Sequence, residues 1–232
     1  MPVRPPSAGP YDQPVQPPST GNAPLTAAFP AELAEDARAV LAVMPASRFR
    51  PITPFPVLVG GRQVTVPGRL YNDEPPARAV ASLSERQRQL LHCLYTRSRD
   101  GRIRQRHLEE IVGSVDPWVV PFVVQLVGEY VLEILVVIRD ALSGLAAPGT
   151  AAHLAYGQFI AENPAFFART QRRVVSYWSC YHRAAHPSFR NHPGHTVLDL
   201  LRSAASTRTG HPWPDLTPAA TRAGGHRDLP AQ

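Results

Sequence analysis

Arginine side chains are concentrated in one stretch of the chain. Seven of them fall within 21 residues, accompanied by Glu85 and Asp100: Arg86, Arg88, Arg97, Arg99, Arg102, Arg104 and Arg106. A guanidinium donates paired hydrogen bonds to carboxylates and phosphates. We predict that this surface binds an acidic protein or a nucleic acid; a solvated face without a partner is the third interpretation. The residues expected to make the contacts are Arg97, Arg99, Arg102, Arg104 and Arg106.

Helices separated by short turns near these arginines also suggest a helix-turn-helix DNA-binding motif. The third helix of that motif must present polar side chains to base edges. Here it reads Trp118-Val-Val-Pro-Phe-Val-Val-Gln-Leu-Val127, which is typical of a protein core. We therefore exclude base readout in the major groove, while binding to the backbone or shape of RNA or DNA remains an alternative.

Three polar residues interrupt the apolar stretch over residues 116–140 at intervals of four. Gln125, Glu129 and Glu133 would form one stripe on a single helix. Two carboxylates one turn apart can hold a metal or transfer protons, but further ligands at matching spacing are missing nearby. We expect a buried polar stripe paired with arginines. A functional site and an interface with another chain remain alternatives.

A group of zinc-binding residue types follows near residue 180. Cys180 and His182 are separated by one residue and therefore point to different sides of a helix, whereas His182 and His186 lie one turn apart. This spacing does not match a zinc finger or ribbon. We predict no metal and no other cofactor, with His182 and His186 as the remaining candidates for ligands and a solvated helix end as the simpler interpretation.

Several catalytic classes are excluded by residue type. All 24 basic residues are arginine, so a phosphate-binding loop with its lysine and Schiff-base chemistry on lysine are absent. The Gly-x-Ser-x-Gly and Gly-x-Gly-x-x-Gly patterns are also missing. The protein is predicted not to be an enzyme, although a metal-dependent enzyme remains the least favoured alternative.

The elements that must position these residues are mostly helical. We predict helices over about 31–44, 84–99, 103–112, 116–140, 150–162, 165–185 and 194–205, with a kink or a later start at Pro121. Ser84 and Gln87 form an expected capping box. Phe167, Tyr177 and Tyr181 are expected on the inner face of the helix over 165–185. Gly60 and Gly61 predict a two-residue hairpin turn between two short strands.

The expected fold class is mainly α: a compact bundle of five or six helices with a small N-terminal β-hairpin arm and disordered termini. Proline-rich composition predicts a disordered tail over 1–30. The short helix and the hairpin arm occupy 31–80, the helical bundle 81–206 and a second disordered tail 207–232. The apolar stretch has the length of a membrane span, but each of two carboxylates within it costs about 2–3 kcal/mol on insertion scales. We predict no membrane association and a cytoplasmic location.

Three segments resemble a family of uncharacterised proteins from GC-rich actinobacteria. They begin at Arg104-Gln-Arg-His-Leu, Pro117-Trp-Val-Val-Pro and Tyr177-Trp-Ser-Cys-Tyr, and the likeness covers roughly residues 55–205. The resemblance implies a bacterial cytoplasmic setting and carries no activity, cofactor or catalytic residue. A GC-rich genome also explains the absence of lysine, so the formal net charge of +6 is weak support for a nucleic-acid partner.

Taken together, the sequence predicts a non-catalytic protein that binds another macromolecule. Reversing the charges of Arg102 and Arg104 is expected to weaken capture of the partner and to change the melting temperature by no more than a few degrees. The oligomeric state is not readable from these patterns.

Overall fold

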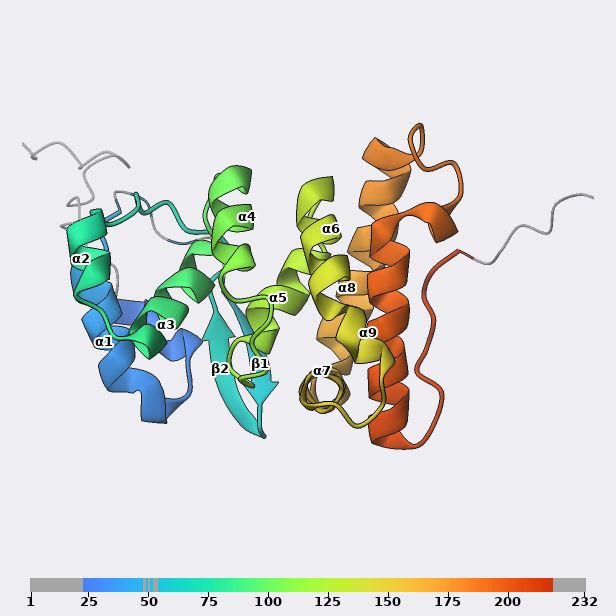
Figure 1. Cartoon of the computed structure of the whole chain (residues 1–232), viewed down its shortest axis with the longest axis horizontal. Helices are drawn as coiled ribbons and strands as arrows, with labels where there is room; N and C mark the ends of the chain where they lie inside the picture. Colours follow the sequence, from blue (N-terminus) through green and yellow to red (C-terminus); the bar gives the residue numbers. More distant parts are fainter. Residues whose placement is uncertain (1–22, 48, 50, 52–53, 219–232) are drawn as a thin grey trace, which may run out of the picture.

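A computed structural model describes residues 23–218 except 48, 50, 52 and 53. Within these residues the chain forms nine α-helices and one two-stranded sheet. Figure 1 shows the helices following one another along the long axis of an elongated molecule, from α1 at one end to α9 at the other. The mainly helical class is confirmed, but the helices exceed the predicted five or six and form an array longer than a compact bundle.

The elements are bounded as follows. The helices are α1 (Ala34–Val43), α2 (Ala77–Ala81), α3 (Glu85–Tyr95), α4 (Gly101–Glu109), α5 (Val120–Val127), α6 (Leu132–Ala141), α7 (Ala151–Glu162), α8 (Pro164–Tyr177) and α9 (Pro193–Thr209); the strands are β1 (Phe55–Val59) and β2 (Arg62–Val66). Short 3-10 helices are η1 (Ala23–Ala28), η2 (Ala31–Leu33), η3 (Leu142–Ala146) and η5 (Phe189–Asn191), and η4 (Trp178–His182) is a π-helical turn.

The predicted hairpin is present. Gly60 and Gly61 have φ angles of 57° and 77°, the left-handed region that a two-residue turn of this kind requires. Antiparallel pairing places Val57 opposite Val64, and both side chains are buried. The amide of Asn163 donates to the carbonyl of Leu58 and its oxygen accepts from the Leu58 N–H, each at 2.8 Å. This amide fixes the hairpin on the junction between α7 and α8.

The apolar stretch over 116–140 is not one helix, which corrects the prediction. Helix α5 is buried along its whole length and ends at Gly128, and α6 begins only at Leu132. Two causes act together. Glycine is a poor helix former, and the interruption lets the carboxylate of Glu129 reach arginines from α4 and from the turn before it. Pro121 stands in the first turn of α5, where its ring is tolerated.

Part of each predicted disordered tail is ordered, which corrects the prediction for those residues. Residues 1–22 and 219–232 lie outside the described part of the chain, but 23–30 and 207–218 are described. Leu25 and Phe29 are buried, and the Phe29 ring stacks on Phe122 of α5 at 5.6 Å. At the other end α9 continues to Thr209, and Asp215 pairs with Arg202 at 2.6 Å. Isolated large apolar residues and one ion pair therefore order segments whose average composition is typical of disorder.

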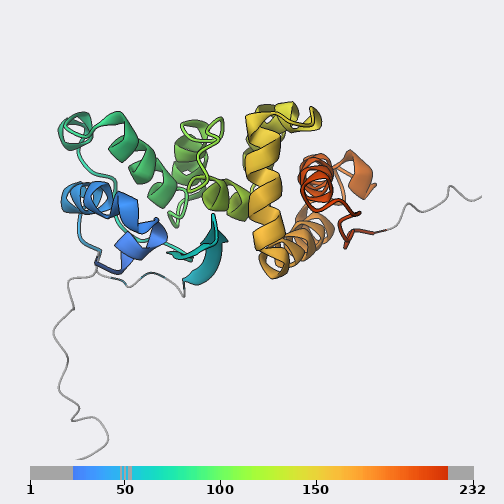
Figure 2. The ribbon, with the colours of Figure 1, turned by 90° about the horizontal axis from the view of Figure 1, so that it is seen from below.

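Helix α7 crosses the molecule at the C-terminal end. Figure 1 views it end-on and Figure 2 views it lengthwise, beside α9. The two helices approach so closely that a β-carbon added to Gly157 would lie 2.5 Å from the backbone oxygen of Ala204. Only glycine fits this contact without a shift of one helix.

Candidate functional site

A buried ion cluster lies in the break between α5 and α6. The carboxylate of Glu129 is 1% exposed and stands 3.4 Å from Arg69, 3.7 Å from Arg97 and 3.5 Å from Arg104. Arg97 also donates to the carbonyls of Pro67 and Gly68. The cluster therefore ties the segment after β2 and the α3–α4 turn to the α5–α6 break.

The cluster carries more positive than negative charge. Burial lowers the pKa of Arg97 to about 9; the carboxylate of Glu129 acts in the opposite direction, and the neighbouring Arg69 and Arg104 guanidiniums add to the lowering. Three guanidiniums share one carboxylate here. At neutral pH the cluster therefore carries a net positive charge in a part of the protein that water hardly reaches.

This burial corrects the predicted arginine surface. Arg97 and Arg104 are 2% and 1% exposed, so neither can meet a partner. The burial of Arg104 could have been predicted from the helix period, because Arg104 shares a face with Leu108 and Ile111, which are buried with it. Charge reversal at Arg104 would place a carboxylate beside Glu129 inside the protein, so the predicted Arg102 and Arg104 pair is the wrong test of the surface.

Arg99, Arg102 and Arg106 are exposed. Arg106 forms an ion pair with Glu74, whereas in the described residues neither Arg99 nor Arg102 has a carboxylate within ion-pair distance. Two of the five predicted arginines are therefore both accessible and unpaired.

Three tyrosines gather at the α5–α6 break and the end of α8, and the sequence analysis missed this cluster. Tyr130 follows Glu129 in the α5–α6 break, and its ring centre lies 6.0 Å from Tyr177 and 6.1 Å from Tyr181. Tyr130 is 49% exposed and Tyr181 is 66% exposed. Nε2 of His182 donates to the backbone carbonyl of Tyr130 at 2.9 Å, which joins the break to the end of α8.

The exposure of Tyr181 is a correction to its predicted inner position. The α-helix ends at Tyr177, and the next turn, η4, is π-helical. A π turn spaces its hydrogen bonds five residues apart instead of four, so α-helical periodicity no longer assigns Tyr181 to the inner face. Phe167, earlier in α8, is buried as expected.

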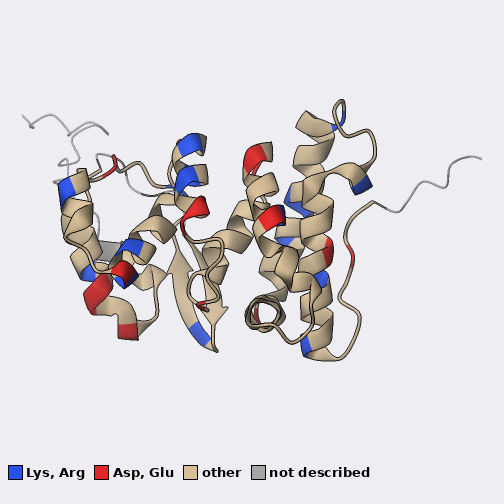
Figure 3. Ribbon diagram, in the orientation of Figure 1, with Lys and Arg blue, Asp and Glu red and all other residues tan. Residues whose placement is uncertain are grey.

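A groove of about 510 Å³ separates the starts of α4 and α6. Asp100, Arg102 and Gln105 line one side, and Val131 and Glu133 line the other. Figure 3 shows these neighbouring helix ends in opposite colours, α4 basic and α6 acidic. Of the predicted polar stripe, Gln125 and Glu129 are buried, whereas Glu133 is exposed in this groove.

We name the surface formed by Arg99, Arg102, Tyr130, Tyr177 and Tyr181 the tyrosine–arginine edge. It is assembled from three parts of the chain: the start of α4, the α5–α6 break and the end of α8. These parts lie together along one edge of the ribbon in Figure 1. The buried ion cluster around Glu129 links the start of α4 to the α5–α6 break beneath this surface.

The histidine candidates meet other histidines. The ring of His192 lies 5.3 Å from His182 and 5.4 Å from His186. Burial, followed by the charges of these two neighbours, lowers the pKa of His192 to about 4. The described ranges contain no group of three or more His, Cys, Asp or Glu side chains placed to hold a metal ion.

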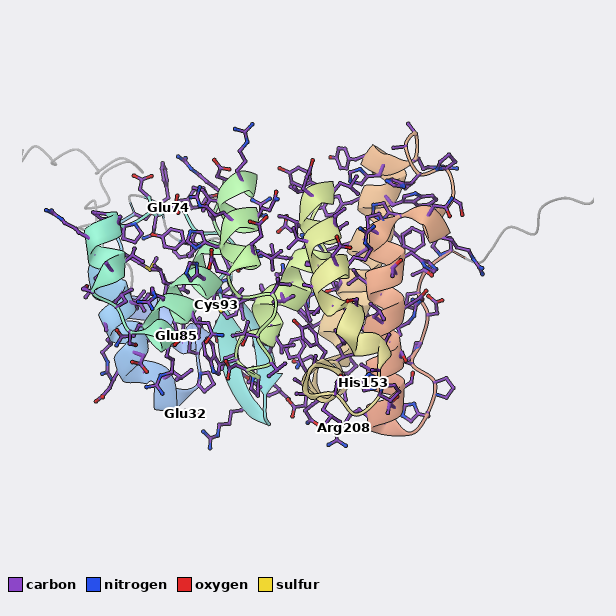
Figure 4. The ribbon with its side chains drawn as sticks, viewed as in Figure 1. Glu32, Glu74, Glu85, Cys93, His153 and Arg208 are labelled. Carbon is purple, nitrogen blue, oxygen red and sulfur yellow. The ribbon has the colours of Figure 1, made fainter. Side chains whose placement is uncertain are left out.

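A second polar chain, also missed from the sequence, joins α3 and α4. Glu74, labelled in Figure 4, lies 2.8 Å from Nε2 of His107, and Nδ1 of His107 lies 2.9 Å from Nδ1 of His92. Burial lowers the pKa of His92 to about 4, with His107 as the second cause. His92 opens onto a cavity of about 500 Å³ that Ser114 and Asp116 also line. With so low a pKa, His92 is a weak base, which favours a structural role.

No protein-family model matches the chain, and neither a curated protein nor a solved structure resembles it significantly. The site and its surroundings therefore carry the functional argument. Among the described helices none is by itself long and apolar enough to cross a membrane; Leu132–Ala146 and Ala151–Glu162 have that length and composition only as a pair bent by 106°.

Proposed function

We propose that this is a non-catalytic protein that binds an acidic segment of another protein through the tyrosine–arginine edge. The observation that carries the proposal is the exposure of Tyr130 and Tyr181 in one cluster at the α5–α6 break, across the groove from the start of α4, where Arg99 and Arg102 are exposed and have no carboxylate partner in the described residues. Tyrosine and arginine dominate the residues that contribute most to protein–protein binding. A rigid tyrosine ring also supplies a large contact area at a small entropic cost.

The charges around the edge favour a protein partner over a nucleic acid. Asp100 lines the groove on the same side as Arg102, and Glu133 lines the opposite side. A uniform phosphate backbone would bring negative charge against both carboxylates, whereas a protein can present an acid to Arg102 and avoid the other two groups. The mixed pattern therefore favours a protein segment that presents separate acidic side chains over a continuous phosphate backbone.

Binding to single-stranded RNA or DNA is the second candidate. It is favoured by the same tyrosines, since exposed aromatic rings beside arginines can stack on bases. Its distinguishing property is an affinity that falls steeply with salt. A gel shift with random-sequence RNA and DNA at two salt concentrations separates the two candidates.

We also propose a cytoplasmic location and membership of the actinobacterial family that the three sequence segments resemble. The absence of any single spanning helix in the described residues is consistent with the first, and the likeness of residues 55–205 supports the second.

The test of the proposed function is affinity purification from the source organism with two matched variants. The first combines Arg102→Glu with Tyr181→Ser on the edge. The control combines Arg208→Glu with Leu154→Ser, both exposed; Figure 4 labels Arg208 at the opposite side of the molecule. We expect quantitative mass spectrometry to show partners that are retained by the control and lost by the edge variant. Equal retention by both would refute the assignment of this surface.

A further inference from the structure

A small cavity lies between α5, α8 and the start of β1, away from the groove between α4 and α6. Its volume is about 60 Å³. Two rings, Phe55 and Phe166, form its apolar wall and stack at 5.5 Å. The rest of its lining is polar: Gln125, Arg169, Thr170 and Arg173. An apolar wall beside two arginines lowers the local polarity and so strengthens charge interactions in the cavity.

The polar lining presents donors. Arg169 and Arg173 are four residues apart on α8 and therefore share a face. The hydroxyl of Thr170 already donates to the backbone carbonyl of Phe166 at 3.1 Å. The side chain of Gln125 is 7% exposed and has no hydrogen-bond partner within the described residues. The polar atoms of this amide are not fully buried, so its N–H is a donor accessible from the cavity, beside two arginines.

The charges around the cavity are unbalanced. Nε of Arg173 lies 3.4 Å from the position that a β-carbon on Gly128 would take, so this side chain packs beside the break that holds Glu129. Five arginines thus surround one region, and in the described part of the chain Glu129 is the only carboxylate within ion-pair distance of any of them: Arg69, Arg97, Arg104, Arg169 and Arg173. Four of these five arginines are buried or half-buried, and such an excess of positive charge favours a bound anion.

The size of the cavity limits the anion. A water molecule needs roughly 10–15 Å³ of such space, so about 60 Å³ accommodates about four oxygen atoms. Guanidiniums match the geometry of oxyanions by donating two parallel hydrogen bonds. Arg169 is exposed, which leaves one side of the cavity accessible from solvent.

We propose that the cavity bounded by Gln125, Arg169 and Arg173 binds one tetrahedral oxyanion of the phosphate or sulfate class, either free or as the terminal group of a small monoester. Arg169 and Arg173 neutralise its charge, and the amide N–H of Gln125 donates to one oxygen. The guanidinium of Arg173 also lies 5.8 Å from the ring centre of Tyr177, so the site adjoins the tyrosine–arginine edge. Anion binding needs no partner at that edge, and it gives the excess of arginines a counter-ion.

The test is thermal unfolding of the full chain in inorganic phosphate, sulfate or glycerol 3-phosphate at constant ionic strength set with sodium chloride. We expect Tm to rise with the logarithm of the anion concentration, to about 5–10 °C above the anion-free value at a concentration 100 times the Kd. A larger effect of glycerol 3-phosphate would identify a monoester as the natural ligand, and a larger effect of phosphate or sulfate would identify the free ion.

Three variants test whether the rise in Tm comes from anion binding in this cavity. Arg169→Gln and Gln125→Leu should abolish the rise, whereas Arg172→Gln should retain it, because Arg172 is exposed on the same helix outside the cavity. The rise is measured against each variant's own Tm without the anion, so a change in basal stability does not obscure it. Isothermal titration of the unmodified protein with phosphate provides a second readout. A Tm that does not rise with the anion, a calorimetric titration that does not saturate, or a rise that Arg169→Gln preserves would overturn the proposal.

Discussion

At the scale of single residues, the buried carboxylate of Glu129 is the charged group on which the stability of the fold most clearly depends. It faces Arg69, Arg97 and Arg104 in the interior. Glu129→Gln keeps the shape but leaves these guanidiniums without a counter-charge, so we expect a loss of about 3–5 kcal/mol in the free energy of unfolding. Urea denaturation measures the loss.

Glu133→Gln is the matched control for that substitution. Glu133 is exposed four residues later in the same stretch, and its change is expected to fall within about 0.5 kcal/mol. Equal stabilities of the two variants would mean that the buried cluster contributes no net stability.

The stability of the fold should depend on pH through His92. Its pKa is about 4 in the folded protein, below the ordinary value of 6.5, because of burial and then the charge of His107. The unfolded chain takes up a proton at His92 between these two values and the folded protein does not. The free energy of unfolding therefore falls as the pH drops from 6.5 towards 4.

Melting temperatures measured between pH 4 and pH 6.5 test whether His92 causes this loss of stability. His92→Gln should make the fall shallower, although not abolish it, since the pKa of His192 is also lowered to about 4. His211→Gln, an exposed histidine just beyond α9, should follow the unmodified protein. A His92→Gln profile parallel to that of the unmodified protein would show that His92 is protonated normally in the folded state.

Individual residues also show which contacts can be predicted from sequence patterns. The capping box at Ser84 and Gln87 was predictable because both partners lie within one helical turn, and the structure confirms it. The burial of Arg97 was not predictable in the same way, since its partner Glu129 is 32 positions later and meets it only after the helices pack. Local hydrogen bonds follow from the sequence, whereas long-range ion pairs require the fold.

At the scale of elements, the contact between α7 and α9 depends on Gly157. A β-carbon there would lie 2.5 Å from the backbone oxygen of Ala204, so Gly157→Ala should separate the helices and cost about 1–3 kcal/mol. Gly144→Ala is the control, because no atom lies within 4 Å of its added carbon. Denaturation midpoints that shift equally in both variants would contradict the close packing of α7 on α9.

The hairpin and the broken helix illustrate the limit of prediction for elements. Gly60 and Gly61 specify their turn through backbone angles that other residues avoid, so the hairpin was predictable. The break at Gly128 was not, because apolar residues continue on both sides and the interruption is stabilised by arginines from elsewhere. The tyrosine cluster depends on that break and on the π turn after Tyr177, and it was therefore missed.

At the scale of the whole molecule, the helices form an elongated array with the tyrosine–arginine edge near its middle (Figure 1). The sequence composition predicted the mainly helical class. Which elements pack against one another, however, depends on particular contacts, such as that of Phe29 with Phe122. The edge also draws on three separated segments, and no linear pattern could indicate that they meet.

The most direct test of partner binding is photo-crosslinking in living cells of the source organism. A photo-reactive amino acid replaces Tyr181 on the edge in one protein and Leu154 on α7 in another; both positions are exposed. We predict a discrete crosslinked protein at position 181 that is absent at position 154 and that disappears when Arg99 and Arg102 are changed to Glu. Identical crosslinking patterns at the two positions, or a crosslink to RNA in place of protein, would contradict the account.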